Sequence, residues 1–155
     1  MNNVKVPLLD IKIKFLPHAV DLPIPQYATA GSAGLDIMSA IPNKEIIIYP
    51  GERSLIETGI CIAIPDGYEG QIRSRSGLSL KNGIIVLNSP GTIDSDYRGE
   101  IKIILANFGN HIFTITHGMR IAQLVINRYE RVCLAKSEEL NTSIRCENGF
   151  GSTGL

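Results

Sequence analysis

Glycine and proline interrupt this chain so often that long helices are excluded. Its 155 residues include fifteen glycines and eight prolines, and short runs rich in β-branched residues lie between them. No stretch of ten or more residues keeps a 3.6-residue apolar period without a breaker, so the pattern predicts short strands. The expected strands are 10–15, 45–49, 54–58, 60–64, 83–87, 101–106, 112–116 and 120–126, with one short helix near 77–81.

The apolar pattern of these runs also indicates how the strands are used. Segment 10–15 alternates charged and apolar residues, which is typical of a half-exposed strand. Segment 83–87, GIIVL, is apolar on both faces, so it lies inside the fold or at a subunit interface. Many short strands separated by turn signals predict an all-β antiparallel fold, either a sandwich or a jelly-roll-like barrel.

Composition changes near residue 137, and this divides the chain in two. The length predicts one domain, which we place at residues 1–136. The last stretch, 137–155, is polar and glycine-rich with few core-type residues, so we expect a flexible C-terminal tail.

Charge and cysteine usage exclude several classes of protein. Fifteen basic residues balance fifteen acidic ones, which argues against a nucleic-acid partner. No apolar run approaches the ~18 residues of a membrane span, and the start lacks a signal-peptide core. We therefore expect a soluble cytoplasmic protein. Cys61, Cys133 and Cys146 stand alone, which disfavours a disulfide framework or a zinc site.

The stretch GTIDSDYRGE (91–100) carries more chemistry than a turn between two apolar strands needs. It half-matches a calcium loop, but Arg98 and Leu105 occupy positions where oxygen ligands are required, so calcium is rejected. The aspartates are either turn formers or include a general base. The residues alone do not say which aspartate would be the base.

Two further stretches have both an ordinary and a ligand-binding interpretation. RSRSGLS (73–79) offers arginines, hydroxyls and a possible helix start, so it is either a polar turn or a phosphate site. ENGFGSTGL (147–155) lacks the lysine of a nucleotide P-loop, yet glycines and hydroxyls suit a phosphate. Its Phe150 either docks onto its own domain or closes over a flat ligand.

Five motifs follow one another along the chain: YATAGSAGLDI (27–37), RSGLS (75–79), NSPGTIDSDYRGE (88–100), GMRIAQ (118–123) and RCENGFGSTG (145–154). Together and in this order they resemble the trimeric dUTP pyrophosphatase (dUTPase) family, and the match runs from about residue 23 to the end. Met119, Cys146 and Asn148 depart from the family pattern, and none of them removes a group with an assigned chemical role.

The resemblance implies a jelly-roll-like antiparallel β-barrel that hydrolyses dUTP to dUMP and pyrophosphate. Such an enzyme keeps uracil out of DNA and supplies dUMP for thymidylate synthesis. By analogy, Asp94 is the general base for a water that attacks the α-phosphorus. Asp96 is a structural acid, paired with Arg98 or with a neighbouring subunit. The resemblance also implies Mg²⁺ held mainly by the substrate phosphates, with Asp36 reaching it through a water, and a homotrimer whose sites are shared between subunits.

The family also implies a set of substrate contacts. Tyr97 would lie under the deoxyribose and exclude a 2′-hydroxyl, and Phe150 would stack on uracil when the tail closes over the site. The uracil edge is assigned to Asn88, Thr92, Ile93 and Lys102. The phosphates are assigned to Arg75, Ser76, Gly77, Gln123, Arg145, Ser152 and Thr153, and Gly151 completes the substrate-binding set.

Two rival functions are weighed against this one. A dCTP deaminase of similar fold needs a glutamate on the strand after the hairpin, and 101–106 (IKIILA) carries no acid. A non-enzymatic binding module would need neither the Asp94 hairpin nor the complete tail motif.

Overall fold

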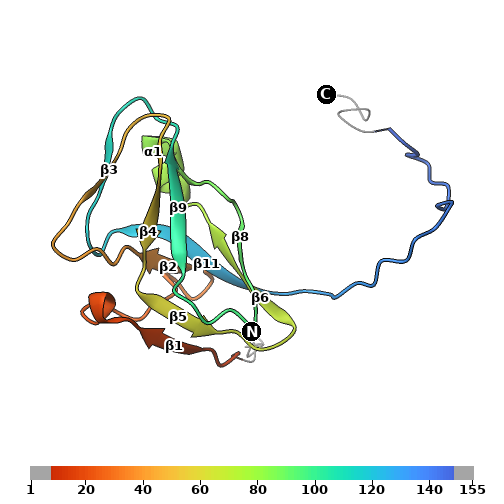
Figure 1. Ribbon diagram of the computed structural model, residues 1–155, viewed down its shortest axis with the longest axis horizontal. Coiled ribbons are helices and arrows are strands. Elements are labelled where there is room, and N and C mark those ends of the chain that lie inside the picture. The colour runs from red at the N-terminus through yellow and green to blue at the C-terminus, as the bar shows by residue number, and fades with distance from the viewer. Residues whose placement is uncertain (1–7, 149–155) are drawn as a thin grey trace, which may run out of the picture.

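The computed structural model describes residues 8–148, which form eleven short strands, one α-helix and one 3₁₀ helix (Figure 1). The elements are β1 (Lys12–Phe15), η1 (Pro17–Ala19), β2 (Leu35–Met38), β3 (Ile46–Ile48), β4 (Arg53–Glu57), β5 (Ile60–Ala63), β6 (Tyr68–Arg73), α1 (Ser76–Asn82), β7 (Ile84–Val86), β8 (Gly91–Ile93), β9 (Lys102–Asn107), β10 (Phe113–Ile115) and β11 (Arg120–Arg128). The all-β prediction is confirmed.

Four antiparallel sheets carry the fold. The larger ones have the strand orders β2-β11-β6-β8 and β4-β9-β7, and two-stranded sheets pair β1 with β5 and β10 with β3. The arrangement is jelly-roll-like, but the sheets do not join into one closed barrel. The strands β8 and β9 belong to different sheets although they are consecutive in the chain, so an opening remains between them.

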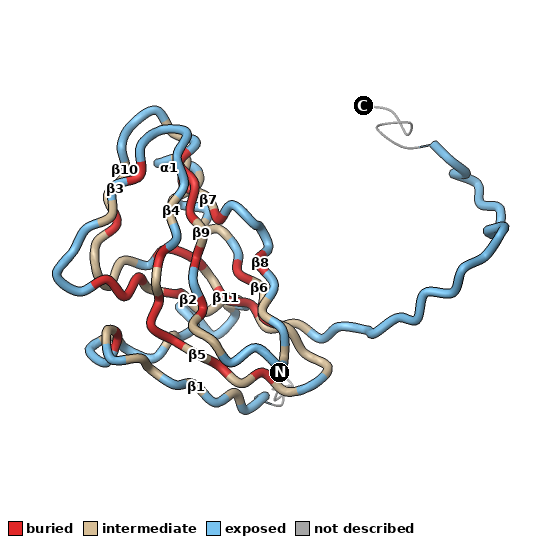
Figure 2. The backbone as a smooth tube through the Cα atoms, in the orientation of Figure 1, coloured by how far each residue is buried: buried red, intermediate tan, exposed pale blue. Residues whose placement is uncertain are grey.

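The core between the sheets is built largely from isoleucine. Ile37, Ile56, Ile103, Leu105 and Ile121 are at most 1% exposed, and they come from both of the larger sheets. Figure 2 shows these buried segments in red at the centre of the fold. Each such side chain contributes about 1.5–3 kcal/mol to folding when it leaves water, so this core fixes the two sheets relative to each other.

The predicted strands are found, and three more were missed. Each expected run contains a strand, and the helix expected near 77–81 is α1. That helix ends at Gly83, whose φ of 69° suits glycine and whose N–H bonds to the carbonyls of Leu78 and Ser79. The missed strands β2, β6 and β8 are short or contain glycine and polar residues, so their apolar signal is weak.

After β11 the chain leads away from the sheets (Figure 1). All residues from 128 to 148 are exposed, as the pale blue segment of Figure 2 shows. The hydrogen bonds given for 137–148 join near neighbours, such as Arg145 Nε to Asn148 O at 2.9 Å. The domain boundary at 136 and the flexibility of the tail stay predictions. Among residues 8–148, no helix is long and apolar enough to span a membrane.

Candidate active site

A pocket of about 270 Å³ lies between the arms of the 91–100 hairpin. Apolar side chains, including Ile72, Val86 and Ile103, form its inner wall. The pocket brings together six residues that the sequence predicted: Asn88, Thr92, Ile93, Asp94, Tyr97 and Lys102. A cavity in which apolar walls meet several placed polar groups is a usual form of a small-ligand site.

Backbone edges face this pocket because the hairpin arms separate. Strand β8 is the edge of its sheet and pairs only with β6. Strand β9 pairs along its length with β4, whereas β7 reaches only Leu105–Asn107. The start of β9, at Lys102, therefore has no β7 partner in its ladder. Backbone N–H and C=O groups at such edges can recognise the hydrogen-bonding edge of a base.

The turn that carries Asp94 is held by its own backbone. Tyr97 N donates to Asp94 O at 3.1 Å. Arg98 Nη1 donates to Ser95 O at 2.6 Å and to Tyr97 O at 2.9 Å. Arg98 thus holds the turn through carbonyl groups. Residues 8–148 show no ion pair between Arg98 and Asp96, one of the two partners that the resemblance implied, and the pairing of Asp96 with a neighbouring subunit stays a prediction. The Asp94 side chain is exposed at the rim, where it can meet water.

Tyr97 folds back over the end of the hairpin. Its hydroxyl donates to Glu100 O at 2.9 Å, and its side chain is close to Gly99. A Cβ at Gly99 would lie 2.5 Å from Tyr97 Oη, so only glycine permits this ring position. Tyr97 remains 44% exposed, which leaves part of the ring free to contact a ligand.

Glu100 also lines the pocket, and the sequence did not single it out. Its Oε1 accepts from Gly59 N at 2.8 Å and from His18 Nε2 at 2.9 Å, and its Oε2 lies 3.4 Å from Lys102 Nζ. Burial raises the pKa of the Glu100 carboxyl, but the bonds from His18, Gly59 and Lys102 outweigh it and hold the pKa below its usual value. His18 and Gly59 are distant in the chain, so no local motif could reveal this contact.

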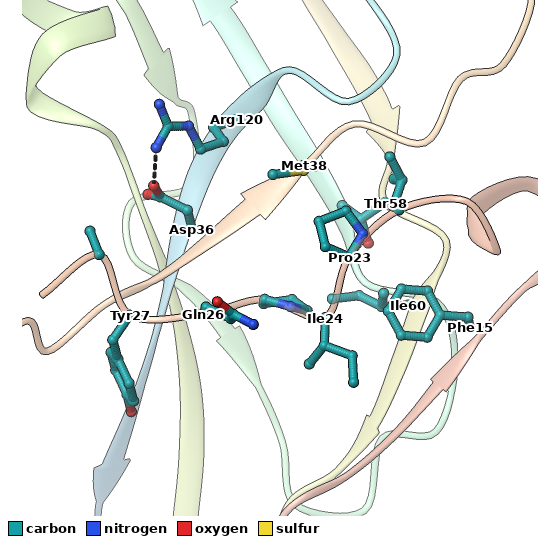
Figure 3. Close-up of a pocket in the computed structure, with 13 residues that line it drawn as sticks. Phe15, Pro23, Ile24, Gln26, Tyr27, Asp36, Met38, Thr58, Ile60 and Arg120 are labelled. Carbon is teal, nitrogen blue, oxygen red and sulfur yellow. Dashed lines mark hydrogen bonds and ion pairs between the residues drawn. The ribbon is translucent and has the colours of Figure 1, made fainter.

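A second cluster gathers cationic groups around Asp36. Strands β2 and β11 pair so that Asp36 lies opposite Gln123, whose Nε2 is 3.3 Å from Asp36 Oδ1. Arg75 Nε lies 3.4 Å from Asp36 Oδ1, and Arg120 Nη1 lies 3.2 Å from Asp36 Oδ2. Figure 3 shows Arg120 and Asp36 facing each other across β2 and β11. Two guanidinium groups beside an amide suit a polyanion such as a triphosphate.

Of the remaining residues predicted to bind phosphate, two lie next to this cluster and one lies in the exposed C-terminal stretch. Ser76 and Gly77 begin α1, directly after Arg75, and both are exposed. Arg75 Nη1 also donates to Arg120 O at 2.8 Å. Arg120 belongs to the GMRIAQ motif but was not predicted as a site residue. Arg145 is exposed; its side chain donates to Asn148 O, and its carbonyl accepts from Asn148 N. Phe150, Gly151, Ser152 and Thr153 lie outside the described residues.

Within one chain the two clusters occupy different places. Asp36 and Arg120 line a cavity of about 360 Å³ with Phe15, Met38 and Ile60 (Figure 3), and that cavity shares no residue with the hairpin pocket. Strands β2 and β8 are the opposite edges of one four-stranded sheet, about 14 Å apart at ordinary strand spacing. One chain therefore presents the hairpin pocket at one edge of the sheet and the Asp36 cluster near the other.

The cluster around Asp36 suits a magnesium ion only as part of a larger complex. In residues 8–148, no group of three histidine, cysteine, aspartate or glutamate side chains could hold a metal ion. The Asp36 carboxylate already faces two arginines, yet its side chain is 12% exposed and can accept bonds from metal-bound water. Mg²⁺ commonly keeps its waters and binds through substrate phosphates, so these residues fit an ion that arrives with a triphosphate.

The family model for dUTPase matches residues 21–154. The chain belongs to the dUTPase family. It is 53% identical over 147 residues to the deoxyuridine 5'-triphosphate nucleotidohydrolase of Methylocella silvestris, covering 94% of this chain and 92% of that protein. It is 50% identical over 147 residues to the enzyme of that name from Anaplasma marginale, covering 95% and 99%.

Solved structures of dUTPases share the fold. The dUTPase of Staphylococcus bacteriophage 80alpha with dUpNHpp superposes with a TM-score of 0.83 at 30% identity, covering 94% of this chain and 99% of that one. A mutant dUTPase from phage phi11 of S. aureus, described with a structural Mg(II) ion, gives 0.73 at 26% identity, covering 84% and 98%. The dUTPase fold expected from the motifs is therefore confirmed.

Proposed function

We propose that this protein hydrolyses dUTP to dUMP and pyrophosphate. The observation that carries the proposal is the hairpin pocket, in which Asp94, Tyr97 and Asn88 line one cavity together with apolar side chains. Relatives about 50% identical over nearly their whole length bear the name of this activity. The reaction would remove a precursor of uracil in DNA and supply dUMP for thymidylate synthesis. A cytoplasmic location belongs to the proposal, because deoxynucleotide precursors are the substrate class.

The pocket supports recognition of a deoxyuridine. Asn88 and the backbone near Thr92, Ile93 and Lys102 would bond to the uracil edge. Cytosine would leave some of these groups unpaired, and unpaired buried donors are penalised more strongly than a missing methylene. The Tyr97 ring would lie under the sugar and leave no room for a 2′-hydroxyl, so UTP would be excluded by steric conflict.

The exposed Asp94 carboxylate supports the role of general base. It would orient a water molecule and accept one proton from it as the water oxygen bonds to the α-phosphorus. The bond from that phosphorus to the bridging oxygen of the β-phosphate breaks at the same time, and pyrophosphate leaves with the bond's electron pair. A positioned base of this kind contributes about 10²–10⁴-fold to rate.

The anion cluster supports binding of the triphosphate. Its phosphates would be contacted by Arg75, Ser76, Gly77 and Gln123. Arg120 lies next to these residues, because both Arg120 and Arg75 contact the Asp36 carboxylate. Magnesium bound to the phosphates would neutralise part of their charge. The tail, with Arg145, Phe150, Gly151, Ser152 and Thr153, would close over the nucleotide, and the exposure of 128–148 leaves it available for that purpose.

A homotrimer with shared sites explains why the clusters lie apart in one chain. The nucleoside pocket of one subunit would meet the anion cluster of another. The outer face of the β4-β9-β7 sheet supports this assembly, because Leu55 lies opposite Ile104 on it and is 53% exposed. The half-buried Ile85 continues the same apolar face. A second copy of this chain would cover these side chains. No membrane or nucleic-acid partner is part of the proposal.

Pyrophosphate release, measured with magnesium for dUTP, dCTP, dTTP and UTP separately, tests the proposal. We expect release from dUTP alone, and a loss of about 10²–10⁴-fold in Asp94→Asn. Asp10→Asn, which changes an exposed aspartate outside both clusters, is the matched control and should keep the wild-type rate. A fully active Asp94→Asn variant would mean that another residue is the general base, and Asp96 would be the next residue to test. No release from any nucleotide by folded protein would leave a binding module.

A further inference from the structure

The carboxylate of Glu100 connects the hairpin to two other parts of the fold. Gly59 lies between β4 and β5, and its N–H donates to Glu100 Oε1; His18 lies in η1 and donates to the same oxygen. Lys102, the first residue of β9, approaches the other oxygen. The Glu100 side chain is only 10% exposed, so these contacts replace most of the water it would otherwise bind.

The backbone at Glu100 and Ile101 is also hydrogen-bonded. Its carbonyl accepts the Tyr97 hydroxyl, and the next residue, Ile101, donates through its N–H to Ile60 O at 2.9 Å. Thr58 Oγ1 in turn donates to Ile101 O at 2.5 Å. The carboxylate and the backbone thus fasten the same short segment to the β4–β5 connection, and the Tyr97 ring is bonded to that segment.

The Tyr97 ring has few other means of support. It is 44% exposed, its hydroxyl bonds to Glu100 O, and its ring lies against Gly99. A ring excludes a 2′-hydroxyl only while it cannot move aside. Displacement by about 1 Å would relieve such a clash, so selectivity depends on what holds the ring.

We propose that Glu100 is a positioning residue for sugar selectivity: its anchored carboxylate fixes the segment to which the Tyr97 hydroxyl is bonded, and so fixes the floor of the nucleoside pocket. The inference rests on the proposed hydrolysis of dUTP and adds a residue to it. Glu100 need not touch the substrate, because it acts through Tyr97. His18 contributes by completing the anchor.

The test is the ratio of kcat/KM for dUTP to kcat/KM for UTP, measured in the full chain. We expect Glu100→Gln to lower this ratio roughly tenfold, mainly by improving turnover of UTP, since the loss of a charge-assisted anchor is of that order. Glu100→Ala should lower the ratio further, because the glutamine still offers an acceptor to Gly59. Tyr97→Phe should lower it as well, since the ring then loses its bond to Glu100.

A double-mutant cycle separates positioning from a general loss of structure. If Glu100 acts through the Tyr97 hydroxyl, the two effects should not add. The double variant Glu100→Gln, Tyr97→Phe should then have the same ratio as the less selective of the two single variants. Glu57→Gln is the matched control, because Glu57 also contacts Lys102, at 3.7 Å, but makes no hydrogen bond to the hairpin turn in the described part of the chain. It should keep the wild-type ratio.

The possible outcomes decide the inference. An unchanged ratio in folded Glu100→Gln, additive effects in the cycle, or an equal loss in Glu57→Gln would each overturn it. If Glu100→Gln does not fold, His18→Ala removes one hydrogen bond to the Glu100 carboxylate, and the ratio of kcat/KM values in that variant decides. Wild-type protein that releases no pyrophosphate from dUTP would instead overturn the proposed function, so the two failures are distinguishable.

Discussion

At the scale of the residue, the ionisation of Glu100 makes the stability of the fold depend on pH. Its pKa lies below the ordinary value of 4.5 because His18, Gly59 N–H and Lys102 favour the ionised form by more than burial disfavours it. Lys102 shows the complementary effect: the bond to Glu100 raises the pKa of its ammonium group. A carboxyl whose pKa is lower in the folded state stabilises the fold above its unfolded pKa, and that stabilisation is lost as pH falls through the folded pKa.

We therefore expect the difference in free energy of unfolding between wild type and Glu100→Gln to depend on pH. It should be constant well above pH 4.5 and should shrink as the pH falls below 4.5. Denaturant unfolding at a fixed protein concentration, repeated at several pH values, measures it. Other carboxylates titrate in both proteins and cancel in the difference. A difference that stayed constant down to the lowest pH would mean that the carboxylate is not held in the ionised form.

At the scale of the element, strands were predictable where burial leaves a continuous apolar run. Strand β9 reads KIILAN and lies largely within the apolar run 101–106 (IKIILA), so its burial follows from the sequence. Strand β6 reads YEGQIR, and only its pairing with β11 and β8 makes it a strand. The motifs likewise placed Asp94 and Asn88 at one pocket. Glu100 escaped prediction because its partners are 41 and 82 residues away, and no local pattern encodes such a contact.

A buried asparagine at the end of β9 stabilises the neighbouring strands. Asn107 is 1% exposed; its Nδ2 donates to Ile48 O at 2.9 Å and to His111 O at 2.8 Å, and its Oδ1 accepts from Gly109 N at 2.9 Å. It thereby joins β9 to β3 and closes the following loop. Removing the amide leaves buried backbone groups without partners.

We expect Asn107→Ala to lower the free energy of unfolding by about 2–3 kcal/mol. Thermal or denaturant unfolding at fixed protein concentration measures the loss. Asn110→Ala, which changes an exposed asparagine in the same loop, is the control and should remain within about 0.5 kcal/mol of wild type. Equal stabilities for the two variants would show that water replaces the Asn107 bonds.

At the scale of the whole molecule, the two clusters and the apolar sheet face require one explanation. A triphosphate attached to a nucleoside in the hairpin pocket needs cationic partners, yet Arg75 and Arg120 gather around Asp36 at another place on the chain. The outer face of β4-β9-β7 carries Leu55, which is 53% exposed in a solitary chain, opposite the half-buried Ile104. Assembly of three chains would satisfy both requirements at once.

Leu55→Lys tests that assembly. Three symmetry-related lysines would enter an apolar interface, and unpaired charges there cost several kcal/mol each, so we expect the trimer to dissociate. Sedimentation equilibrium should then give the 16.9 kDa of one chain in place of three chains, with loss of dUTP hydrolysis. Ile112→Lys is the control: Ile112 is similarly exposed, at 58%, but lies outside this sheet. A Leu55→Lys variant that remained trimeric would place the interface elsewhere, and a wild-type monomer that hydrolysed dUTP would overturn the shared site, because one chain would then complete both halves alone.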